Sequence, residues 1–372
     1  MVNKKLKVLL TAFNHLDVGG IQKMIMILVK ELYGIVDFDI IVFSSKVGYY
    51  ESEFEKYGRI FRCPHYEGNS IIRRKVDYYI RYNRIRKYVE NIIRENGAYD
   101  VLHTNAFFES APCLEAAYRM GVPVRIAHSH NTGVQDTRSF LIRKINQVYK
   151  KVYRERINRF ATDCVGCSDA AREYLFGKNS GYVIYNCIED DKFAVCTERP
   201  WKNLRLLNVG NFVDQKNQVF LIEIFKEIIH LIPDCHLTLI GRITPYFDQV
   251  KAKIVQWNLQ DSVSILPYDT DIATAMKQSD YFLLPSKFEG LPLVLLEAQK
   301  SGMHCFASTS VTEESNCGLV TYIALGNAKE WADTISKFYI ESGPQKHPVE
   351  MKRFARTTYV HDFLEVYRRA RQ

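Results

Sequence analysis

The chain has 372 residues, of which 47% are hydrophobic and 25% are charged, and these fractions exclude an intrinsically disordered protein. The length is sufficient for two domains of ordinary size. No apolar run approaches the roughly 18 residues of a membrane span, and Asn14 and His15 interrupt the N-terminal apolar run. The nine cysteines form no framework; we interpret Cys164 and Cys167, which have CxxC spacing, as two buried thiols. We therefore expect a cytoplasmic protein.

Predicted strands and helices alternate along the first half of the chain. Short apolar runs of β type are separated by stretches whose apolar residues recur at helical spacing. This alternation predicts a parallel sheet with helices on both faces. The predicted strands are 7–13, 38–43, 99–103 and 124–128, and the first predicted helix is 19–32.

The same alternation begins again after residue 200. The predicted strands are 204–209, 237–240, 263–266 and 281–284, and the predicted helices are 217–231, 247–257 and 271–278. Two successive doubly wound units are the simplest account, so the predicted fold class is α/β. We predict a Rossmann-like domain at 1–187, a second one at 188–350, and a C-terminal helical segment at 351–372 that could pack back on the first domain.

Open parallel sheets bind ligands beyond the carboxyl ends of their strands. Two such units that face each other would form a cleft from both sets of strand ends. We therefore expect the chemistry of this protein in loops that directly follow strands.

The net charge of +8 is concentrated in two segments. Residues 70–95 hold eight Lys or Arg against three acids, and residues 139–160 hold seven against one. Either these are solvated helix faces, or they attract an anionic surface, such as a membrane or a diphosphate-bearing acceptor. No zinc finger or RNP motif supports nucleic-acid binding. The apolar positions at helical spacing are Ile72, Val76, Ile80, Ile142, Ile145, Tyr149 and Val152.

The most informative segment is 281–302, which predicts a strand, a loop and a helix that stops. Pro292 fits a first helical turn and Gly302 fits a helix end. The N–H groups of Gly290, Leu291 and their neighbours could face a diphosphate, helped by the helix dipole. Carboxylates suit paired hydroxyl groups, so Glu297 could hold a ribose and Glu289 a sugar.

This segment resembles the retaining glycosyltransferases of family 4, which have the GT-B architecture. That family carries two Glu separated by seven residues, and Glu289 and Glu297 fit the pattern. The resemblance implies that Glu289 lies near the donor sugar and that Glu297 binds the ribose of a nucleotide-sugar donor, expected to be a UDP-sugar.

A second match to the family is the segment 209–217. The family pattern is Gly-Arg, a few residues, then Lys, and both cations contact the donor diphosphate. Lys216 fits the Lys, but Asn211 occupies the place of the Arg. We hypothesise that Arg242, which follows the next strand, compensates for it.

Asp269-Thr270-Asp271 matches the DxD pattern that binds a metal in a different glycosyltransferase architecture. Here it directly precedes a predicted helix, so Asp271 or Thr270 is interpreted as an N-cap. Because Lys216 and helix N–H groups are available, we expect no metal or other cofactor and metal-independent activity.

In the first half, Gly19 and Gly20 resemble the family's N-terminal Gly-Gly loop, at a helix start where backbone can approach a ligand. Histidines cluster at two predicted strand ends, in 103–105 and 127–132. The resemblance aligns His130 with a histidine near the reacting centre, and His128 is the competing assignment. The family that this sequence resembles retains configuration at the anomeric carbon, and no residue here stands out as a nucleophile. The resemblance therefore favours a mechanism in which the leaving diphosphate accepts the proton of the acceptor. Lys216 and the helix start at Gly290 would stabilise the developing charge.

The predicted function is transfer of a hexose or N-acetylhexosamine from a UDP-sugar to a saccharide, expected to be linked to polyprenyl diphosphate, at the inner face of the plasma membrane. The sequence resembles those of bacterial capsule and exopolysaccharide transferases. Two alternatives remain: a UDP-sugar epimerase of the same build, and a non-catalytic protein that binds sugar nucleotides or a membrane surface.

Overall fold

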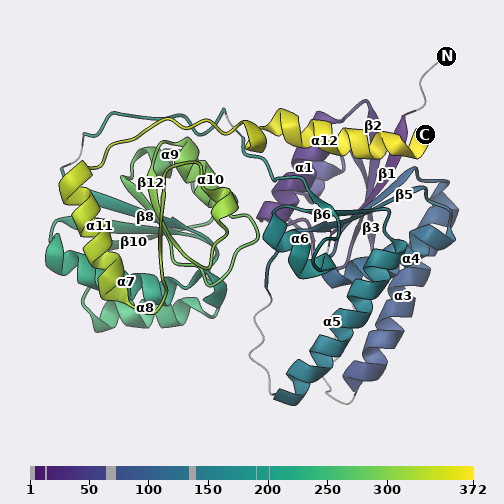
Figure 1. Ribbon diagram of the computed structural model, residues 1–372, viewed down its shortest axis with the longest axis horizontal. Helices are drawn as coiled ribbons and strands as arrows, with labels where there is room; N and C mark the ends of the chain where they lie inside the picture. Colours follow the sequence, from purple (N-terminus) through teal and green to yellow (C-terminus); the bar gives the residue numbers. More distant parts are fainter. Residues whose placement is uncertain (1–4, 13–14, 64–72, 134–139, 190, 201) are drawn as a thin grey trace. The chain divides into compact units, whose positions relative to one another are not determined.

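A computed structural model describes residues 5–12, 15–63, 73–133, 140–189, 191–200 and 202–372 (Figure 1). It divides into two compact units, one formed by 1–187 with 356–372 and the other by 188–355. Each unit is built on its own parallel sheet. Among the described helices, none combines the length and the apolar character that a membrane crossing requires.

The sheet of the first unit has the strand order β3-β2-β1-β4-β5-β6-β7, with all described pairs parallel. Helices α3, α4 and α5 cover one face, and α1 and α12 lie side by side on the other (Figure 1). Its strands are β1 Leu6–Ala12, β2 Val36–Val42, β3 Gly58–Arg62, β4 Val101–Asn105, β5 Val124–Ser129, β6 Asp163–Gly166 and β7 Tyr182–Val183. Its helices are α1 Gly20–Glu31, α2 Glu51–Phe54, α3 Arg73–Asn96, α4 Ser110–Arg119, α5 Phe140–Phe160, α6 Asp169–Phe176 and α12 Arg356–Arg368.

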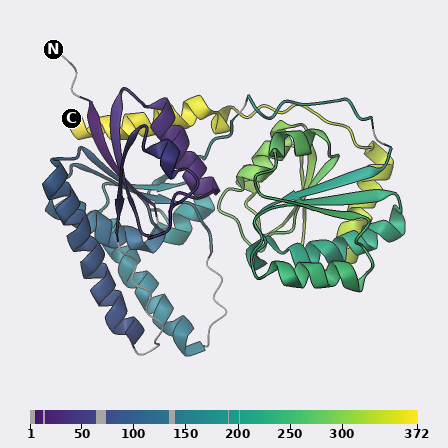
Figure 2. The same cartoon turned by 180° about the vertical axis from the view of Figure 1, so that it is seen from behind.

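The sheet of the second unit has the order β10-β9-β8-β11-β12-β13, again parallel throughout the described pairs. Helices α7, α8 and α11 pack on one face around buried Trp331, and α9 and α10 pack on the other (Figure 2). Its strands are β8 Leu204–Val209, β9 Cys235–Ile240, β10 Val263–Leu266, β11 Tyr281–Leu284, β12 His304–Ser308 and β13 Val320–Ile323. Its helices are α7 Gln218–Leu231, α8 Phe247–Gln256, α9 Ile272–Lys277, α10 Leu293–Lys300 and α11 Ala328–Ser342.

The chain leaves the second unit at Ala355, slightly later than the expected residue 350. Phe354 is fully buried there, and its carbonyl accepts a hydrogen bond from the N–H of Ile188 at 3.1 Å. The helix α12 then returns to the first unit, where Arg356 lies 3.3 Å from Glu31 of α1. The first unit therefore combines residues 1–187 with the later segment 356–372.

Two details of the sequence interpretation change in the structure. Cys167 is buried as expected, but Cys164 is partly exposed on β6, where its Sγ lies 3.8 Å from Oδ1 of Asn158. Of the apolar residues at helical spacing in the two basic segments, Ile80 is 54% exposed and Val152 is 41% exposed. The buried stripe of the described part of α3 is formed instead by Tyr82, Ile85, Val89, Ile92 and Ile93. The side chains of Ile72, Val76, Ile142 and Ile145 lie outside the described part.

Candidate active site

Two loops of the second unit meet where the strand order of its sheet changes direction. Strands β8 and β11 are neighbours there, and the chain continues outward from them on opposite sides. Such a switch point is the usual ligand site of an open parallel sheet. The loop after β8 carries Lys216, in a single 3-10 turn Asp214–Lys216, and the loop after β11 carries Glu289.

Lys216 and Glu289 form an ion pair across these two loops. The Nζ of Lys216 lies 2.7 Å from Oε1 of Glu289, and the two side chains are 17% and 9% exposed. The stem of Lys216 passes over Gly210, because a Cβ added at that glycine would lie 3.1 Å from both Cδ and Cε of the lysine. A residue with a side chain at position 210 would displace the lysine, so Gly210 keeps the path of the stem open.

Backbone contacts hold the two loops together around this pair. The N–H of Lys287 donates to the carbonyl of Gln215 at 2.8 Å, and Nε2 of Gln215 donates to the carbonyl of Phe288 at 2.9 Å. Nδ2 of Asn217 donates to the carbonyl of Pro285 at 3.1 Å, from a left-handed backbone conformation that asparagine tolerates better than most residues. These bonds fix the positions from which the charged side chains extend.

The predicted strand, loop, helix and stop in 281–302 are confirmed. Helix α10 begins at Leu293, so Pro292 is the N-cap and lies one position before the expected first turn. At the other end, Gly302 has φ +79°. Its N–H donates to the carbonyl of Gln299, and the N–H of Met303 donates to the carbonyl of Ala298. This pair of hydrogen bonds is the Schellman motif that ends a helix.

Glu297 lies inside α10 and is only 3% exposed, and Gly290 and Leu291 are also buried. The first amides of α10 have no carbonyl of an earlier turn to bind, as in any helix. The structure thus places Glu289, Gly290 and Leu291 in the loop before α10 and Glu297 inside the helix, and Glu289 contacts Lys216.

Asn211 and Arg242 follow the neighbouring strands β8 and β9 and contact each other. The backbone N–H of Arg242 donates to Oδ1 of Asn211 at 3.4 Å, and its carbonyl accepts from the N–H of Phe212 at 3.0 Å. The guanidinium of Arg242 lies 4.9 Å from the ring centroid of Tyr268. Arg242 therefore lies next to the residue that replaces the family's arginine; its contact with a diphosphate stays a prediction.

Asp271, one of the two expected candidates, is the N-cap of α9, and Thr270 is not. Its carboxylate accepts from the N–H of Ala273 at 3.1 Å and from the hydroxyl of Thr274 at 2.6 Å. No group of three or more His, Cys, Asp or Glu side chains suited to a metal occurs among the residues that the structure describes. Metal independence stays a prediction.

The first unit has a cavity of about 230 Å³ at the carboxyl ends of β4 and β5, next to the start of α1. Strands β1 and β4 are the neighbours at which this sheet changes direction. Gly19 is the extended N-cap of α1 and Gly20 is its first residue, so the predicted Gly-Gly loop directly precedes the cavity residue Ile21. The lining residues are Ile21, Asn105, Phe107, Glu109, His128, His130 and Asn131.

Both candidate histidines line this cavity, with ring centroids 3.9 Å apart. Nε2 of His130 lies 2.8 Å from Oδ1 of Asn105. Three buried nitrogens have no hydrogen-bond partner within the described parts of the chain: Nδ1 of His130, Nε2 of His128 and Nδ2 of Asn105. The cavity therefore accommodates either histidine as the one that meets a ligand.

Burial keeps these imidazoles uncharged at neutral pH. It lowers the pKa of His130 to about 3 and the pKa of His128 well below its usual value, with smaller contributions to His128 from the other two histidines. Burial also raises the pKa of Glu109, although the positive charge of Arg81, which lies 3.3 Å away, acts to lower it. The cavity offers neutral nitrogen groups in a mostly apolar wall.

Sequence reasoning did not find the contribution of the C-terminal helix to this cluster. Tyr367 of α12 lies 2.7 Å from Nδ1 of His103, and Phe363 stacks on the same imidazole with centroids 4.8 Å apart. The sequence interpretation included packing of the segment 351–372 on the first domain, but its aromatic content does not say which side chains the helix would contact.

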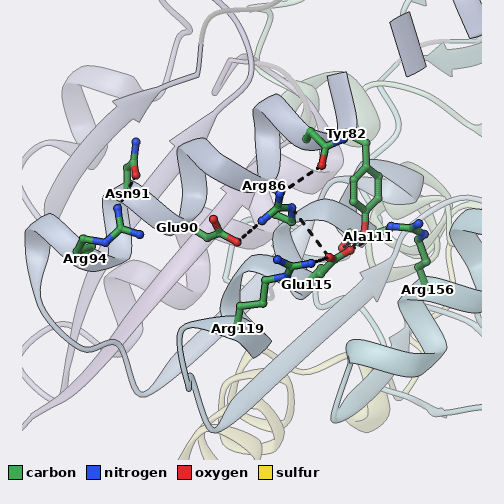
Figure 3. A network of polar contacts seen from close by, with 10 residues as sticks. Tyr82, Arg86, Glu90, Asn91, Arg94, Ala111, Glu115, Arg119 and Arg156 are labelled. Carbon is green, nitrogen blue, oxygen red and sulfur yellow. Dashed lines mark hydrogen bonds and ion pairs between the residues drawn. The ribbon is translucent and has the colours of Figure 1, made fainter. Parts of the chain in front are cut away.

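Some of the positive charge on the two basic helices is paired inside the first unit (Figure 3). The buried Glu115 of α4 accepts hydrogen bonds from Tyr82 at 2.5 Å, from Arg119 at 2.6 Å and from Arg156 at 3.1 Å. Arg86 pairs with Glu90 at 2.5 Å. These contacts connect α3, α4 and α5, so the two predicted basic segments partly stabilise the fold.

Residues 191–358 match the family model described as glycosyl transferases group 1. The fold class predicted from the sequence is confirmed, since both sheets are Rossmann-like and solved glycosyltransferases of GT-B build share the fold. HepE of Anabaena, crystallised with UDP and glucose, superposes with a TM-score of 0.74 at 17% identity, over 97% of this chain and 98% of its own.

Two relatives give the comparison by sequence. EpsF of Bacillus subtilis (strain 168), named as a candidate glycosyltransferase, is 29% identical over 365 residues, 93% of this chain and 91% of its own length. An Escherichia coli enzyme is 27% identical over 227 residues, 56% of this chain and 58% of its own. Its name is UDP-Gal:alpha-D-GlcNAc-diphosphoundecaprenol alpha-1,3-galactosyltransferase.

Proposed function

We propose that this protein is a retaining glycosyltransferase of the family 4 type that transfers a hexose or N-acetylhexosamine from a UDP-sugar to a lipid-linked saccharide in surface polysaccharide biosynthesis. The observation that carries the proposal is the Lys216–Glu289 pair of 2.7 Å at the switch point of the second sheet, beside the start of α10. A cation, a carboxylate and a helix N-terminus in one place suit a ligand that has both phosphate and hydroxyl groups.

In this proposal the second unit binds the donor. Lys216 and the first amides of α10 contact the diphosphate, and Arg242 adds a second cation in place of the arginine that Asn211 replaces. The buried Glu297 accepts hydrogen bonds from the ribose hydroxyls, and Glu289 accepts from the hydroxyls of the sugar. On donor binding, the lysine therefore exchanges one anionic partner, the carboxylate of Glu289, for another, the diphosphate.

The chemical step needs charge stabilisation more than a protein nucleophile. The bond between the anomeric carbon and the diphosphate oxygen breaks, and an acceptor oxygen forms a bond on the same face of the sugar. The departing diphosphate takes the proton of the acceptor hydroxyl. Lys216 and the amides of α10 stabilise the negative charge that develops on the diphosphate, a contribution of about 10²–10³ in rate for a single donor group. His130, with His128 as the competing residue, is proposed to face the reacting sugar.

The identities of the donor and the acceptor rest on similarity. HepE binds UDP and glucose in its crystals, which favours a UDP-sugar as donor. The name of the Escherichia coli relative specifies a saccharide on diphosphoundecaprenol, which favours a polyprenyl-diphosphate acceptor and hence a place at the inner membrane face. Exposed basic residues of α3 and α5, such as Lys87 and Lys151, could contribute to binding of an anionic surface.

The test is incubation of the purified protein with radiolabelled UDP-sugars and a membrane extract. Label that moves into the lipid fraction supports transfer. Label in a free, altered sugar would instead identify a UDP-sugar epimerase, and binding without turnover would identify a sugar-nucleotide binding protein. Lys216→Met should abolish transfer, and Lys226→Met on α7, where Lys226 pairs with the adjacent Glu227 at 3.2 Å, is the matched control and should retain it.

A further inference from the structure

A hydrogen-bonded series of three buried polar side chains runs from the C-terminal helix α12 to the cavity of the first unit. The hydroxyl of Tyr367 lies 2.7 Å from Nδ1 of His103, and Nε2 of His103 lies 3.2 Å from Nδ1 of His128. None of the three is more than 1% exposed. The series ends at Nε2 of His128, a residue that lines the cavity, and this nitrogen has no hydrogen-bond partner among the described residues.

The imidazoles of His103 and His128 each carry a single proton on their ring nitrogens at neutral pH. Burial, together with the nearby His130, lowers the pKa of His103 to about 3, and the pKa of His128 is likewise lowered well below its usual value. A neutral imidazole has one N–H donor and one bare acceptor nitrogen. The position of the proton on one ring therefore determines which nitrogen of the next ring can donate.

Only two arrangements of these protons satisfy both hydrogen bonds. In the first, Tyr367 donates to Nδ1 of His103, His103 donates from Nε2 to Nδ1 of His128, and the proton of His128 is on its unpartnered Nε2. In the second, every bond is reversed, and the buried hydroxyl of Tyr367 must donate to another acceptor. The structure shows no other acceptor for this hydroxyl in the described part of the chain. A buried O–H without an acceptor is strongly disfavoured, so the first arrangement holds.

We infer that Tyr367 is a positioning residue that, through His103, fixes the proton of His128 on Nε2 and so makes His128 an N–H donor to a ligand oxygen in the cavity. The tyrosine lies 264 residues further along the sequence than His103. Phe363 of the same helix packs on both imidazoles, with centroid distances of 4.8 Å to His103 and 5.1 Å to His128, and keeps their rings in register.

The neighbouring groups complete a defined pattern. Oδ1 of Asn105 is an acceptor, so Nε2 of His130 must be the donor in their 2.8 Å bond, and Nδ1 of His130 is left as an acceptor. Nδ2 of Asn105 is a second free donor. Two donors and one acceptor, all neutral, fit the hydroxyl groups of a sugar better than an anion. That the hydroxyls belong to a saccharide substrate rests on the proposed function; the proton position itself does not.

The test is long-range ¹H–¹⁵N correlation NMR on the full-length protein with ¹⁵N-labelled histidine, in the absence of any substrate. The two tautomers differ in which ring nitrogen resonates as the protonated one, and His103→Gln and His128→Gln assign the signals. We expect both His103 and His128 to carry the proton on Nε2. Tyr367→Phe should shift the tautomer signals of both rings, whereas Tyr359→Phe, the same change at another buried tyrosine of α12, should leave them in place.

A wild-type His128 with its proton on Nδ1 would overturn the inference, and so would a folded Tyr367→Phe protein with an unchanged His128 tautomer. If Tyr367→Phe does not fold, the wild-type spectrum alone decides. Because no substrate is present, failure of the proposed sugar transfer leaves this result intact. In an active enzyme, Tyr367→Phe should raise the KM for the saccharide that enters the cavity by about tenfold, which corresponds to one weakened hydrogen bond, with a smaller change in kcat.

Discussion

The ammonium of Lys216 and the carboxylate of Glu289 lie 2.7 Å apart, although 73 residues separate them in the chain. Both side chains are largely buried, so each charge depends on the other. Removal of one partner from a buried pair leaves an uncompensated charge, which costs more than removal of both. We expect Lys216→Met and Glu289→Gln each to lower the free energy of unfolding by about 1–3 kcal/mol, and the double variant to lose less than the sum.

Denaturant unfolding of the four proteins in a double-mutant cycle measures this coupling. Additive single effects would show that the two groups do not depend on each other. All three variants should also lose transferase activity, and the Lys226→Met control should retain both stability and activity.

Arg242→Ala should weaken binding of the nucleotide diphosphate about 10- to 100-fold, because a charge-assisted hydrogen bond is worth about 1.5–3 kcal/mol. The residue lies beside Asn211, where the family pattern has an arginine. Titration calorimetry with UDP measures the effect, with Lys251→Ala on α8 as the control for a lost surface charge. Unchanged affinity and turnover in Arg242→Ala would remove this arginine from the donor site.

Activity should persist in EDTA. Lys216 and the amides of α10 are expected to balance the diphosphate charge, and Asp271 of the DxD sequence already caps α9. A transfer assay with and without EDTA checks this, with manganese added back in a third sample. Loss of activity that manganese restores would contradict the prediction.

Glu115→Gln should lower the free energy of unfolding by about 1–3 kcal/mol at neutral pH, because the carboxylate accepts from one tyrosine and two arginines. Burial alone would raise the pKa of Glu115, but the bonds from Tyr82 and Arg119 and the nearby arginine charges hold it below its ordinary 4.5. A lowered pKa contributes stability above the ordinary value, and this contribution is lost as the pH falls through the folded-state pKa. The difference between wild type and Glu115→Gln should therefore shrink below about pH 4.5; a difference independent of pH would contradict it.

The first unit should lose stability as the pH falls from neutrality, because its buried histidines stay neutral. The pKa of His103 is about 3 in the folded protein, against an ordinary 6.5. Between these two pKa values, the histidine binds one more proton in the unfolded protein than in the folded protein. Each such histidine therefore lowers the free energy of unfolding by about 1.4 kcal/mol for each pH unit that the pH falls. Denaturation at several pH values gives the slope of the free energy of unfolding against pH. This slope should be smaller for His103→Gln than for wild type. His361→Gln, a change at an exposed position on α12, is the control and should keep the slope of the wild type.

Hydrophobic spacing and turn residues predicted much of the fold. The strands β8, β10 and β11 begin and end at the predicted residues, and α7 begins one residue later than predicted. These elements are specified locally, because their periodicity and their Gly, Pro and Asn boundaries lie within a few residues of each other. The buried face of α3 was harder to predict, since the same segment carries apolar residues on more than one side, and only its packing against α4 and α5 decides that Tyr82 is buried and Ile80 is not.

The sequence by itself determined the α/β class, the two successive sheets and the candidate donor residues Lys216, Glu289 and Glu297, because each depends on a local pattern of spacing. Only the tertiary structure decided that Lys216 and Glu289 form a pair and that Arg242 lies beside Asn211. It also decided that Tyr367 reaches His103. The physical reason is that parallel strand pairing and helix packing bring distant segments together, and the hydrogen bonds that form there leave no trace in the spacing of either segment alone.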